Sequence, residues 1–249
     1  MSALLVLWDV DFTLVNTAGV GWQLYRQAFA EVFGRELPDV ARRTDMAGRT
    51  DRAIVIDVLT QAGVADPRGQ VGAFQAALGR FAPGVAPMVA ARAVVLPGVA
   101  EALATLAGHP DVVQSLLTGN IRPLAEVKLG PLGLTRSLDL DVGAYGSEHE
   151  VRSELVDLAR ARATQAYDAD FSGPATVLIG DTPHDVRAAL VTGARAIAVA
   201  TGQFSVAELT AAAAADGAAP GEVTVLADLA DTPAVVAAVL DGRAGAPAA

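Results

Sequence analysis

Two aspartates separated by one residue, Asp9 and Asp11, follow the apolar run Leu4–Trp8 near the start of the chain. The run is typical of a buried parallel strand, and side chains two positions apart point to the same side of an extended chain. Both carboxylates are therefore predicted to face one site beyond the end of the strand, where α/β proteins usually bind ligands. Two close anions need a metal, a shared proton or cationic ligands between them, so the pair indicates chemistry.

Two later polar clusters also follow apolar runs. Thr118-Gly119-Asn120 comes after the predicted strand 112–117, and Asp181 and Asp185 come after the predicted strand 175–179. The carboxyl ends of parallel strands share one edge of a sheet, so these residues are predicted to converge with the first pair. Lys128 falls on the helix predicted after Asn120, and it is the only lysine among 18 lysines and arginines. A lone lysine indicates either that an ammonium group is required there or that one lysine survived by chance.

The remaining pattern supplies the elements that would hold these residues. Strands are predicted at 3–9, 112–117, 138–142, 175–179, 196–200 and 223–226, and most are separated by helical periodicity. Helices are predicted at about 17–34, 51–62, 69–82, 98–108, 121–130, 150–166, 184–193 and 232–240, with the alanine run at 211–215 in a surface helix. This alternation predicts an α/β fold with a doubly wound parallel sheet. Residues 17–92 contain no long strand, so we expect a Rossmann-like core from 1–16 and 93–249 and a helical cap domain at 17–92.

Composition restricts the class of function. A hydrophobic content of 52% in 249 residues supports a sizeable core, and a formal charge of −10 argues against nucleic acid or an anionic membrane as the main partner. The chain contains no cysteine, which excludes disulfides, thiolate zinc sites and cysteine nucleophiles. The first apolar run is too short for a membrane span and lacks a basic flank, so a cytoplasmic protein is expected.

The motifs together resemble those of the haloacid dehalogenase-like hydrolase superfamily, and of its phosphatases in particular. Asp-x-Asp-x-Thr at 9–13, a strand ending in Thr118, Lys128, and Gly-Asp-x-x-x-Asp at 180–185 occur in the family's order. The helical insertion falls where one class of these enzymes carries a mobile cap. One departure is Phe12, at a position where glycine is commoner in the family.

The resemblance implies a role for each of these residues. Asp9 would be the nucleophile that forms an aspartyl-phosphate, and Asp11 would be the general acid and base. Asp9, Asp181 and the backbone carbonyl of Asp11 would bind Mg²⁺, with Asp185 as an additional ligand or a support. Thr118, Gly119 and Asn120 would hold the phosphoryl oxygens, and Lys128 would place its charge against the nucleophile and the phosphate.

In the predicted cap, Gly48-Arg49-Thr50-Asp51 is the best candidate for substrate contact. Arg49 could meet a carboxylate or phosphate of the substrate, or Thr50 or Asp51 could simply cap the next helix and leave Arg49 solvated. Trp22 and Tyr25 could line the cleft, but packing in the core of the cap is the favoured interpretation.

The leading interpretation is a magnesium-dependent phosphatase acting on a small phosphorylated metabolite and similar to phosphoglycolate phosphatases, as a monomer or homodimer. A sugar-phosphate mutase of the same superfamily and a non-catalytic binding module stay open as alternatives. A haloacid dehalogenase is disfavoured because it usually lacks the second carboxylate, here Asp11. A phosphonate hydrolase is excluded because the predicted cap contains no lysine for a Schiff base.

Overall fold

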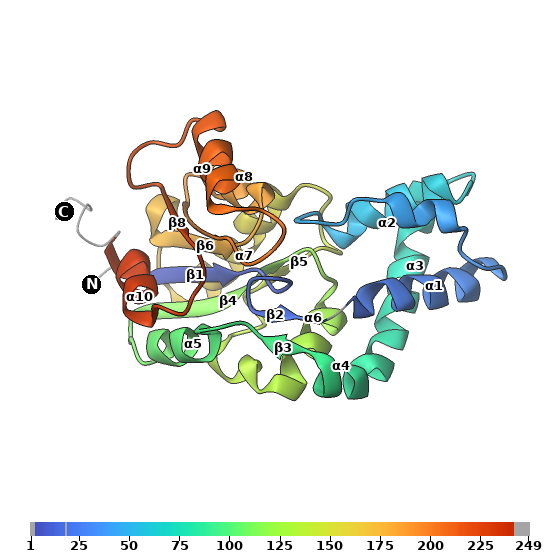
Figure 1. Cartoon of the computed structure of the whole chain (residues 1–249), viewed down its shortest axis with the longest axis horizontal. Coiled ribbons are helices and arrows are strands. Elements are labelled where there is room, and N and C mark those ends of the chain that lie inside the picture. The colour runs from blue at the N-terminus through green and yellow to red at the C-terminus, as the bar shows by residue number, and fades with distance from the viewer. Residues whose placement is uncertain (1–2, 18, 242–249) are drawn as a thin grey trace.

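A six-stranded sheet forms the centre of the computed structural model, which describes residues 3–17 and 19–241 (Figure 1). Its order is β5 (Ala144–Tyr145), β4 (Val112–Thr118), β1 (Leu4–Trp8), β6 (Thr176–Gly180), β7 (Arg195–Val199) and β8 (Val223–Leu226). All neighbouring strands are parallel. The predicted α/β fold with a doubly wound parallel sheet is confirmed, and the carboxyl ends of β1, β4 and β6 lie side by side.

Alternation along β1 assigns its side chains to two helical layers. Leu4, Val6 and Trp8 pack with α5 (Val99–Ala107), α6 (Arg122–Leu129) and α10 (Thr232–Leu240). Leu5 and Leu7 pack on the other face with α7 (Arg152–Tyr167) and α8 (Pro183–Val191). A further helix, α9 (Val206–Ala215), precedes β8; it packs on α8 and covers β7. Both faces of β1 are thus buried, as its uninterrupted apolar sequence predicts.

The predicted strand at 138–142 is wrong: the edge strand is β5, at Ala144–Tyr145, and 138–142 is a loop. The carboxylate of Asp139 accepts a hydrogen bond from the N–H of Asp141 at 3.0 Å, which closes a local turn. An Asp side chain that bonds its own neighbouring backbone competes with a strand ladder in this way. The apolar residues Leu138 and Val142 are nevertheless buried, which explains the strand-like pattern.

The segment between β1 and α5 is helical and lies to the right in Figure 1. It contains α1 (Val20–Phe33), α2 (Asp51–Gln61), α3 (Pro67–Phe81) and α4 (Ala86–Arg92), with 3₁₀ turns at Asp39–Arg43 and Ala82–Val85. Its apolar side chains form a hydrophobic cluster of their own, to which the sheet domain contributes Ile121 and Leu124. The two chain connections pair as a short antiparallel ribbon, β2 (Val15–Asn16) with β3 (Val94–Val95).

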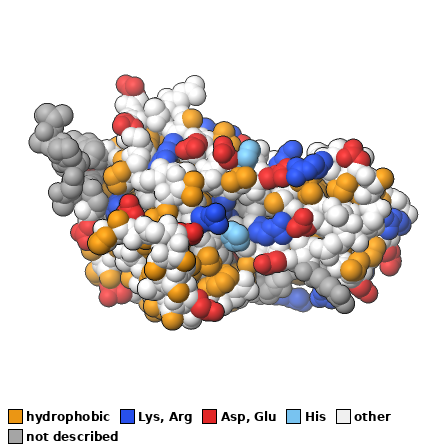
Figure 2. Space-filling view, turned by 90° about the horizontal axis from the view of Figure 1, so that it is seen from above, with side chains coloured by type: hydrophobic (Ala, Val, Ile, Leu, Met, Phe, Trp, Pro, Cys, Tyr) orange, Lys and Arg blue, Asp and Glu red, His pale blue; other side chains and the backbone are white. Residues whose placement is uncertain are grey.

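Charged side chains of both signs are interspersed on the face shown in Figure 2. Within residues 3–17 and 19–241, no helix combines the length and the apolar character that a bilayer span requires.

Candidate active site

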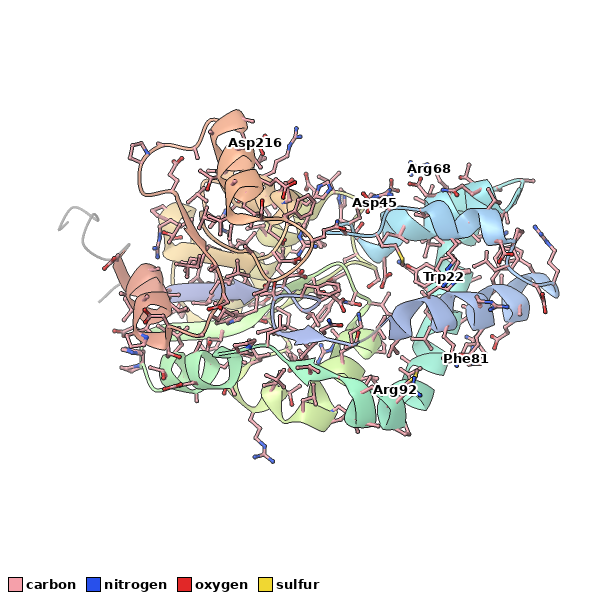
Figure 3. All side chains as sticks on the ribbon, in the orientation of Figure 1. Trp22, Asp45, Arg68, Phe81, Arg92 and Asp216 are labelled. Carbon is pink, nitrogen blue, oxygen red and sulfur yellow. The ribbon has the colours of Figure 1, made fainter. Side chains whose placement is uncertain are left out.

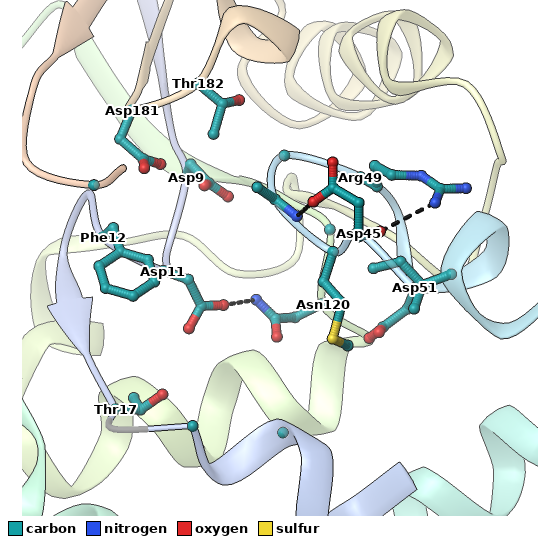
Figure 4. A pocket seen from close by; sticks show the side chains of 18 of the residues that line it. Asp9, Asp11, Phe12, Thr17, Asp45, Arg49, Asp51, Asn120, Asp181 and Thr182 are labelled. Atoms are coloured by element: carbon teal, nitrogen blue, oxygen red, sulfur yellow. Dashed lines mark hydrogen bonds between the residues drawn. The ribbon is translucent and has the colours of Figure 1, made fainter. Parts of the chain in front are cut away.

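A cavity of about 610 Å³ lies between the carboxyl edge of the sheet and the helical segment 20–92. The predicted site residues that line it are Asp9, Asp11, Arg49, Gly119, Asn120, Lys128 and Asp181. Thr118 and Asp185 are not among its described lining residues; both are buried directly behind it. The sheet therefore brings together residues that are up to 172 positions apart, as the convergence of strand ends predicts (Figure 4).

Asp9 is fixed at the end of β1 and almost entirely buried. Its N–H donates to the carbonyl of Ile179 at 2.8 Å, which ties it to β6. Burial raises the pKa of its carboxyl to about 6, and the nearby carboxylates of Asp185 and Asp11 add to this, whereas Arg152 opposes it. The carboxylate remains mostly ionised at neutral pH, as a nucleophile must be.

Arg152, which the sequence reasoning missed, is the cation next to Asp9. Its Nη2 lies 2.9 Å from Oδ1 of Asp9 and 2.6 Å from Oδ1 of Asp185. The same guanidinium donates to the carbonyls of Leu117, at 3.1 Å, and Gly48, at 3.2 Å. It enters the site from the first residue of α7, with 7% of its surface exposed. The donors of a guanidinium are spread over a planar fork, so they can reach acceptors on separate elements, whereas an ammonium group has all its donors on one atom.

Asp9, Asp181 and Asp185 each offer a carboxylate oxygen within 4.8 Å of the others, a spacing that could hold a metal ion. Oxygen-only donors suit Mg²⁺. Asp185 is already engaged: its Oδ2 accepts from the N–H and hydroxyl of Thr182 at 3.1 and 2.6 Å. Asp181 forms no salt bridge with any described residue, and burial together with the two neighbouring carboxylates raises its pKa to about 8. Asp9 and Asp181 are therefore the side chains with oxygens available to a cation.

Asp11 belongs to a second group of contacts. Lys128 Nζ lies 2.7 and 2.6 Å from the two carboxylate oxygens of Asp11 and 2.7 Å from the side-chain oxygen of Asn120. The amide nitrogen of Asn120 donates to Asp11 at 2.8 Å (Figure 4). The expected contact of Lys128 with the nucleophile is therefore wrong in this structure: the lysine pairs with Asp11, and Arg152 pairs with Asp9.

Thr118 and Gly119 shape the loop that carries Asn120. The hydroxyl of Thr118 is fully buried and accepts from the side-chain amide of Asn120 at 2.8 Å, so it orients that side chain. Gly119 lines the cavity, and a Cβ there would lie 2.0 Å from the carbonyl oxygen of Arg49. A side chain at position 119 is therefore incompatible with the observed approach of the loop that carries Arg49.

Phe12 adopts a left-handed backbone conformation with φ of 58°. This region favours glycine, and it costs a residue with a Cβ about 1–2 kcal/mol. The conformation is held by hydrogen bonds from the Phe12 N–H to Val15 O at 2.8 Å and from the Thr201 hydroxyl to Phe12 O at 2.5 Å. The ring is 44% exposed and lines the cavity.

Arg49 is paired within its own segment. Its Nη2 lies 2.7 Å from Asp57 of α2, and its Nη1 donates to the carbonyl of Asp45 at 3.0 Å. In Figure 4 its guanidinium points away from Asp9 and Asp11. Thr50 caps α2 by accepting from the N–H of Ala53 at 3.3 Å. Of the two interpretations for this segment, helix capping is the one for which the structure shows contacts.

Asp51, the last residue of the segment 48–51 that the sequence indicates for substrate contact, is buried and lines the cavity. Its carboxylate accepts hydrogen bonds from the hydroxyl of Tyr25 and from the N–H of Ile121, the latter at 2.8 Å. Tyr25 is 1% exposed, as expected of a core residue, but it also lines the cavity, and Trp22 lines it beside Tyr25. Both aromatic residues thus pack with the hydrophobic cluster of the helical segment, as expected, and they also line the cavity.

The model of the haloacid dehalogenase-like hydrolase family matches residues 6–190, and a model of related HAD-like hydrolases matches residues 153–232. The first match spans most of the chain and includes Asp9, Asp11, Lys128, Arg152, Asp181 and Asp185. The chain belongs to the haloacid dehalogenase-like hydrolases.

Solved structures share this fold. A predicted phosphatase from Clostridium acetobutylicum superposes with a TM-score of 0.65 at 17% identity, covering 95% of this chain and 99% of the other. A protein from Lactobacillus plantarum, provisionally assigned as a phosphoglycolate phosphatase, gives 0.55 at 13% identity, covering 96% and 100%. One from Thermotoga maritima, provisionally assigned as a beta-phosphoglucomutase, gives 0.54 at 18% identity, covering 94% and 98%. No curated protein matches the chain.

Proposed function

We propose that the protein is a magnesium-dependent phosphatase that hydrolyses a small phosphomonoester through an aspartyl-phosphate on Asp9. The observation that carries this proposal is the arrangement at the end of β1: a buried carboxylate opens onto a cavity, with a cation on one side and further carboxylates on the other. The family match supports a hydrolase, and the named structures include phosphatases.

Asp9 and Arg152 would share the first step. Arg152 holds Oδ1 of Asp9 at 2.9 Å, which fixes the carboxylate and leaves Oδ2 to attack phosphorus. The guanidinium also lies where negative charge grows on the phosphoryl oxygens, and it stabilises that charge without moving. Asp185 keeps Arg152 in place through its 2.6 Å contact and is itself fixed by Thr182.

Asp11 would transfer the protons. It is the first-motif carboxylate that remains 36% exposed at its side chain, so it can reach both a leaving alcohol and a water molecule in the cavity. Lys128 and Asn120 hold the Asp11 side chain on the cavity wall. These two contacts keep the Asp11 carboxylate apart from that of Asp9. Protonated Asp11 would first donate its proton to the leaving oxygen. The resulting carboxylate would then accept a proton from the hydrolytic water.

Mg²⁺ would be bound by Asp9 and Asp181, with the backbone carbonyl of Asp11 as a further oxygen ligand and Asp185 as the support of Arg152. When bound, the ion supplies positive charge that offsets the phosphate oxygens and the crowded carboxylates. Gly202 permits this crowding, because a Cβ there would lie 1.8 Å from Oδ2 of Asp181.

Residues 17–92 would act as a cap over the site. The chain enters and leaves this segment through the short β2–β3 ribbon, which is a natural hinge. The segment also docks directly on the sheet domain: the N–H of Asp51 donates to Gly119 O at 2.6 Å and the N–H of Arg52 donates to Gly146 O at 2.8 Å. Opening would break these contacts and expose the cavity.

Phosphate release by the purified protein with Mg²⁺, from a panel of phosphomonoesters, tests the proposal. Asp9→Asn should abolish turnover and leave the circular dichroism spectrum unchanged, because an amide has nearly the same shape but is not a nucleophile. Asp11→Asn should slow turnover by about 10²–10⁴. Wild-type rates in Asp9→Asn would exclude the covalent mechanism.

A further inference from the structure

We propose that the cavity selects phosphomonoesters whose alcohol part is uncharged and carries an apolar ring or chain, with Trp22 as the residue that determines this specificity. The inference rests on the proposed phosphatase function and defines its substrate class. It differs from the small carboxylated substrate that a likeness to phosphoglycolate phosphatases implies.

The first observation concerns charge. The described lining residues include three cations, and each has a carboxylate partner: Arg49 pairs with Asp57, Lys128 with Asp11, and Arg152 with Asp9 and Asp185. Arg152 and Lys128 adjoin the reacting end of the site, where the phosphate would lie. A second anionic group on the substrate would therefore have to take Arg49 from Asp57.

The lining also carries negative charge away from the phosphate end. Asp45 lines the cavity beside Arg49, and among the described residues its carboxylate accepts a hydrogen bond from the exposed backbone N–H of Ala47 at 3.1 Å. Asp51 is buried, with its oxygens taken by Tyr25 and Ile121. A substrate carboxylate would face these groups and lose its hydration without gaining a new partner, which is unfavourable.

The second observation concerns the apolar wall. Trp22 and Tyr25 of α1 lie nearly parallel, with ring centroids 6.2 Å apart and planes 11° apart. Trp22 is half-buried and projects between α1 and α2 (Figure 3), and it packs with the same hydrophobic cluster as Met46 and Ile54. Leu124 of α6 completes this wall from the sheet domain. A partly exposed indole on a cavity wall offers a ring of the substrate a stacking surface.

The size of the cavity agrees with such a substrate. Its 610 Å³ corresponds to about twenty water molecules, at about 30 Å³ for each. This is within the range of about 300–1,000 Å³ that is typical of pockets for organic ligands. A phosphate with a two-carbon acid would leave much of the apolar wall in contact with water, whereas a phosphate with an aromatic or branched alkyl group would cover it.

The experiment compares benzyl phosphate, 2-phosphoglycolate and methyl phosphate, all of which have alkoxide leaving groups. We expect kcat/KM for benzyl phosphate to exceed that for phosphoglycolate at least tenfold. Trp22→Ala should lower kcat/KM for benzyl phosphate about tenfold, mainly through KM, because the ring of the substrate loses its stacking contact with the indole. The same variant should lower kcat/KM for methyl phosphate much less than that for benzyl phosphate, so the ratio of the two should fall. Phe33→Ala, an aromatic truncation on the same helix outside the cavity, is the matched control and should leave the ratio of substrates unchanged.

Calorimetry with the Asp9→Asn variant measures the affinity of the cavity for the same three compounds without turnover. The inference would be supported if Asp9→Asn binds benzyl phosphate more tightly than phosphoglycolate and the variant with both Asp9→Asn and Trp22→Ala loses this preference. Equal or better use of phosphoglycolate, or a Trp22→Ala effect that is the same for benzyl and methyl phosphate, would overturn it. If wild-type protein releases phosphate from none of the three while the binding preference holds, the proposed hydrolysis fails and the specificity of the pocket stands.

Discussion

Arg152 joins the nucleophile to the rest of the site, so its removal gives the sharpest test of the geometry. The change is Arg152→Met, which keeps most of the side-chain volume and removes the charge. It would leave Asp9 and Asp185 buried without their cation and would remove donors to the carbonyls of Gly48 and Leu117. Breaking a buried ion pair by removing one partner costs about 3–5 kcal/mol of unfolding free energy.

A loss of this size corresponds to a fall in Tm of about 6–20 °C for a protein of this length. The assay is thermal unfolding in EDTA, so that no divalent ion offsets the charge of the unpaired carboxylates. Arg122→Met is the matched control: Arg122 pairs with Glu126 and Asp141 on the surface, its side chain is 42% exposed, and its loss should cost at most about 1 kcal/mol. Arg152→Lys should fall between wild type and Arg152→Met, because one ammonium keeps the charge but cannot reach every acceptor.

A double-mutant cycle separates the buried pair from the loss of packing. In an Asp185→Asn background Arg152→Met should cost less than in wild type, since one of its two carboxylate partners is already neutral. If Arg152→Met lowers Tm no more than Arg122→Met does, the buried network contributes nothing to stability, and the assignment of Arg152 as the cation that fixes Asp9 is refuted.

Three further outcomes are expected. Lys128→Ala should lower kcat by about 10²–10³. Lys128→Arg should recover only part of this loss, because Nζ of the lysine fits among three oxygens at 2.6–2.7 Å. A fully active arginine variant would contradict the assigned contact. Mg²⁺ at 100 times its Kd should stabilise wild type by about 2.7 kcal/mol and so raise its Tm, but it should not raise the Tm of Asp181→Asn, whereas EDTA should abolish turnover. Solution scattering with and without a phosphate analogue should show a change in the cap angle, and identical profiles would count against a moving cap.

The sequence predicts much of this architecture because local signals and global topology agree. Apolar runs of strand length alternate with helical periodicity, and three of the runs end in polar residues. In a parallel sheet that pattern alone requires the polar ends to meet, so Asp9, Asn120 and Asp181 could be placed in one site before any contact was known. The start of α2 was also predictable, since Thr50 is a strong capping residue.

Arg152 was missed because a strand was misplaced. Placing the edge strand at 138–142 puts Arg152 ten residues beyond its end, in the first turn of the helix predicted at 150–166 and apart from any predicted strand end. The edge strand in fact ends at Tyr145, and α7 begins at Arg152. The short loop between them places Arg152 at the carboxyl edge of the sheet. The turn at Asp139 that displaces the strand depends on one side-chain hydrogen bond, which hydrophobic periodicity does not reveal. An arginine at the first position of a helix that follows a parallel strand was the available signal.

The pairing of the two cations could not be predicted for a different reason. The side chains of Lys128 and Arg152 both extend to the carboxyl edge of the sheet, and neighbouring side chains determine which carboxylate each one contacts. Asn120 contacts both Lys128 and Asp11. Thr182 holds one oxygen of Asp185, and the other oxygen contacts Arg152. Sequence spacing fixes the element on which each residue lies, but not the direction in which a long side chain extends.

The charges of the site show why a divalent cation fits it. Four carboxylates, those of Asp9, Asp11, Asp181 and Asp185, meet the two cationic side chains of Lys128 and Arg152. Lys128 is taken by Asp11, and Arg152 is shared between Asp9 and Asp185, so the excess negative charge is concentrated on the side of Asp181. Burial, together with the neighbouring carboxylates of Asp9 and Asp185, raises the pKa of Asp181 to about 8, and the opposing effect of Arg152 is too small to prevent this. A site built only to bind a phosphate dianion would carry excess positive charge, whereas these residues favour a cation and a phosphate together.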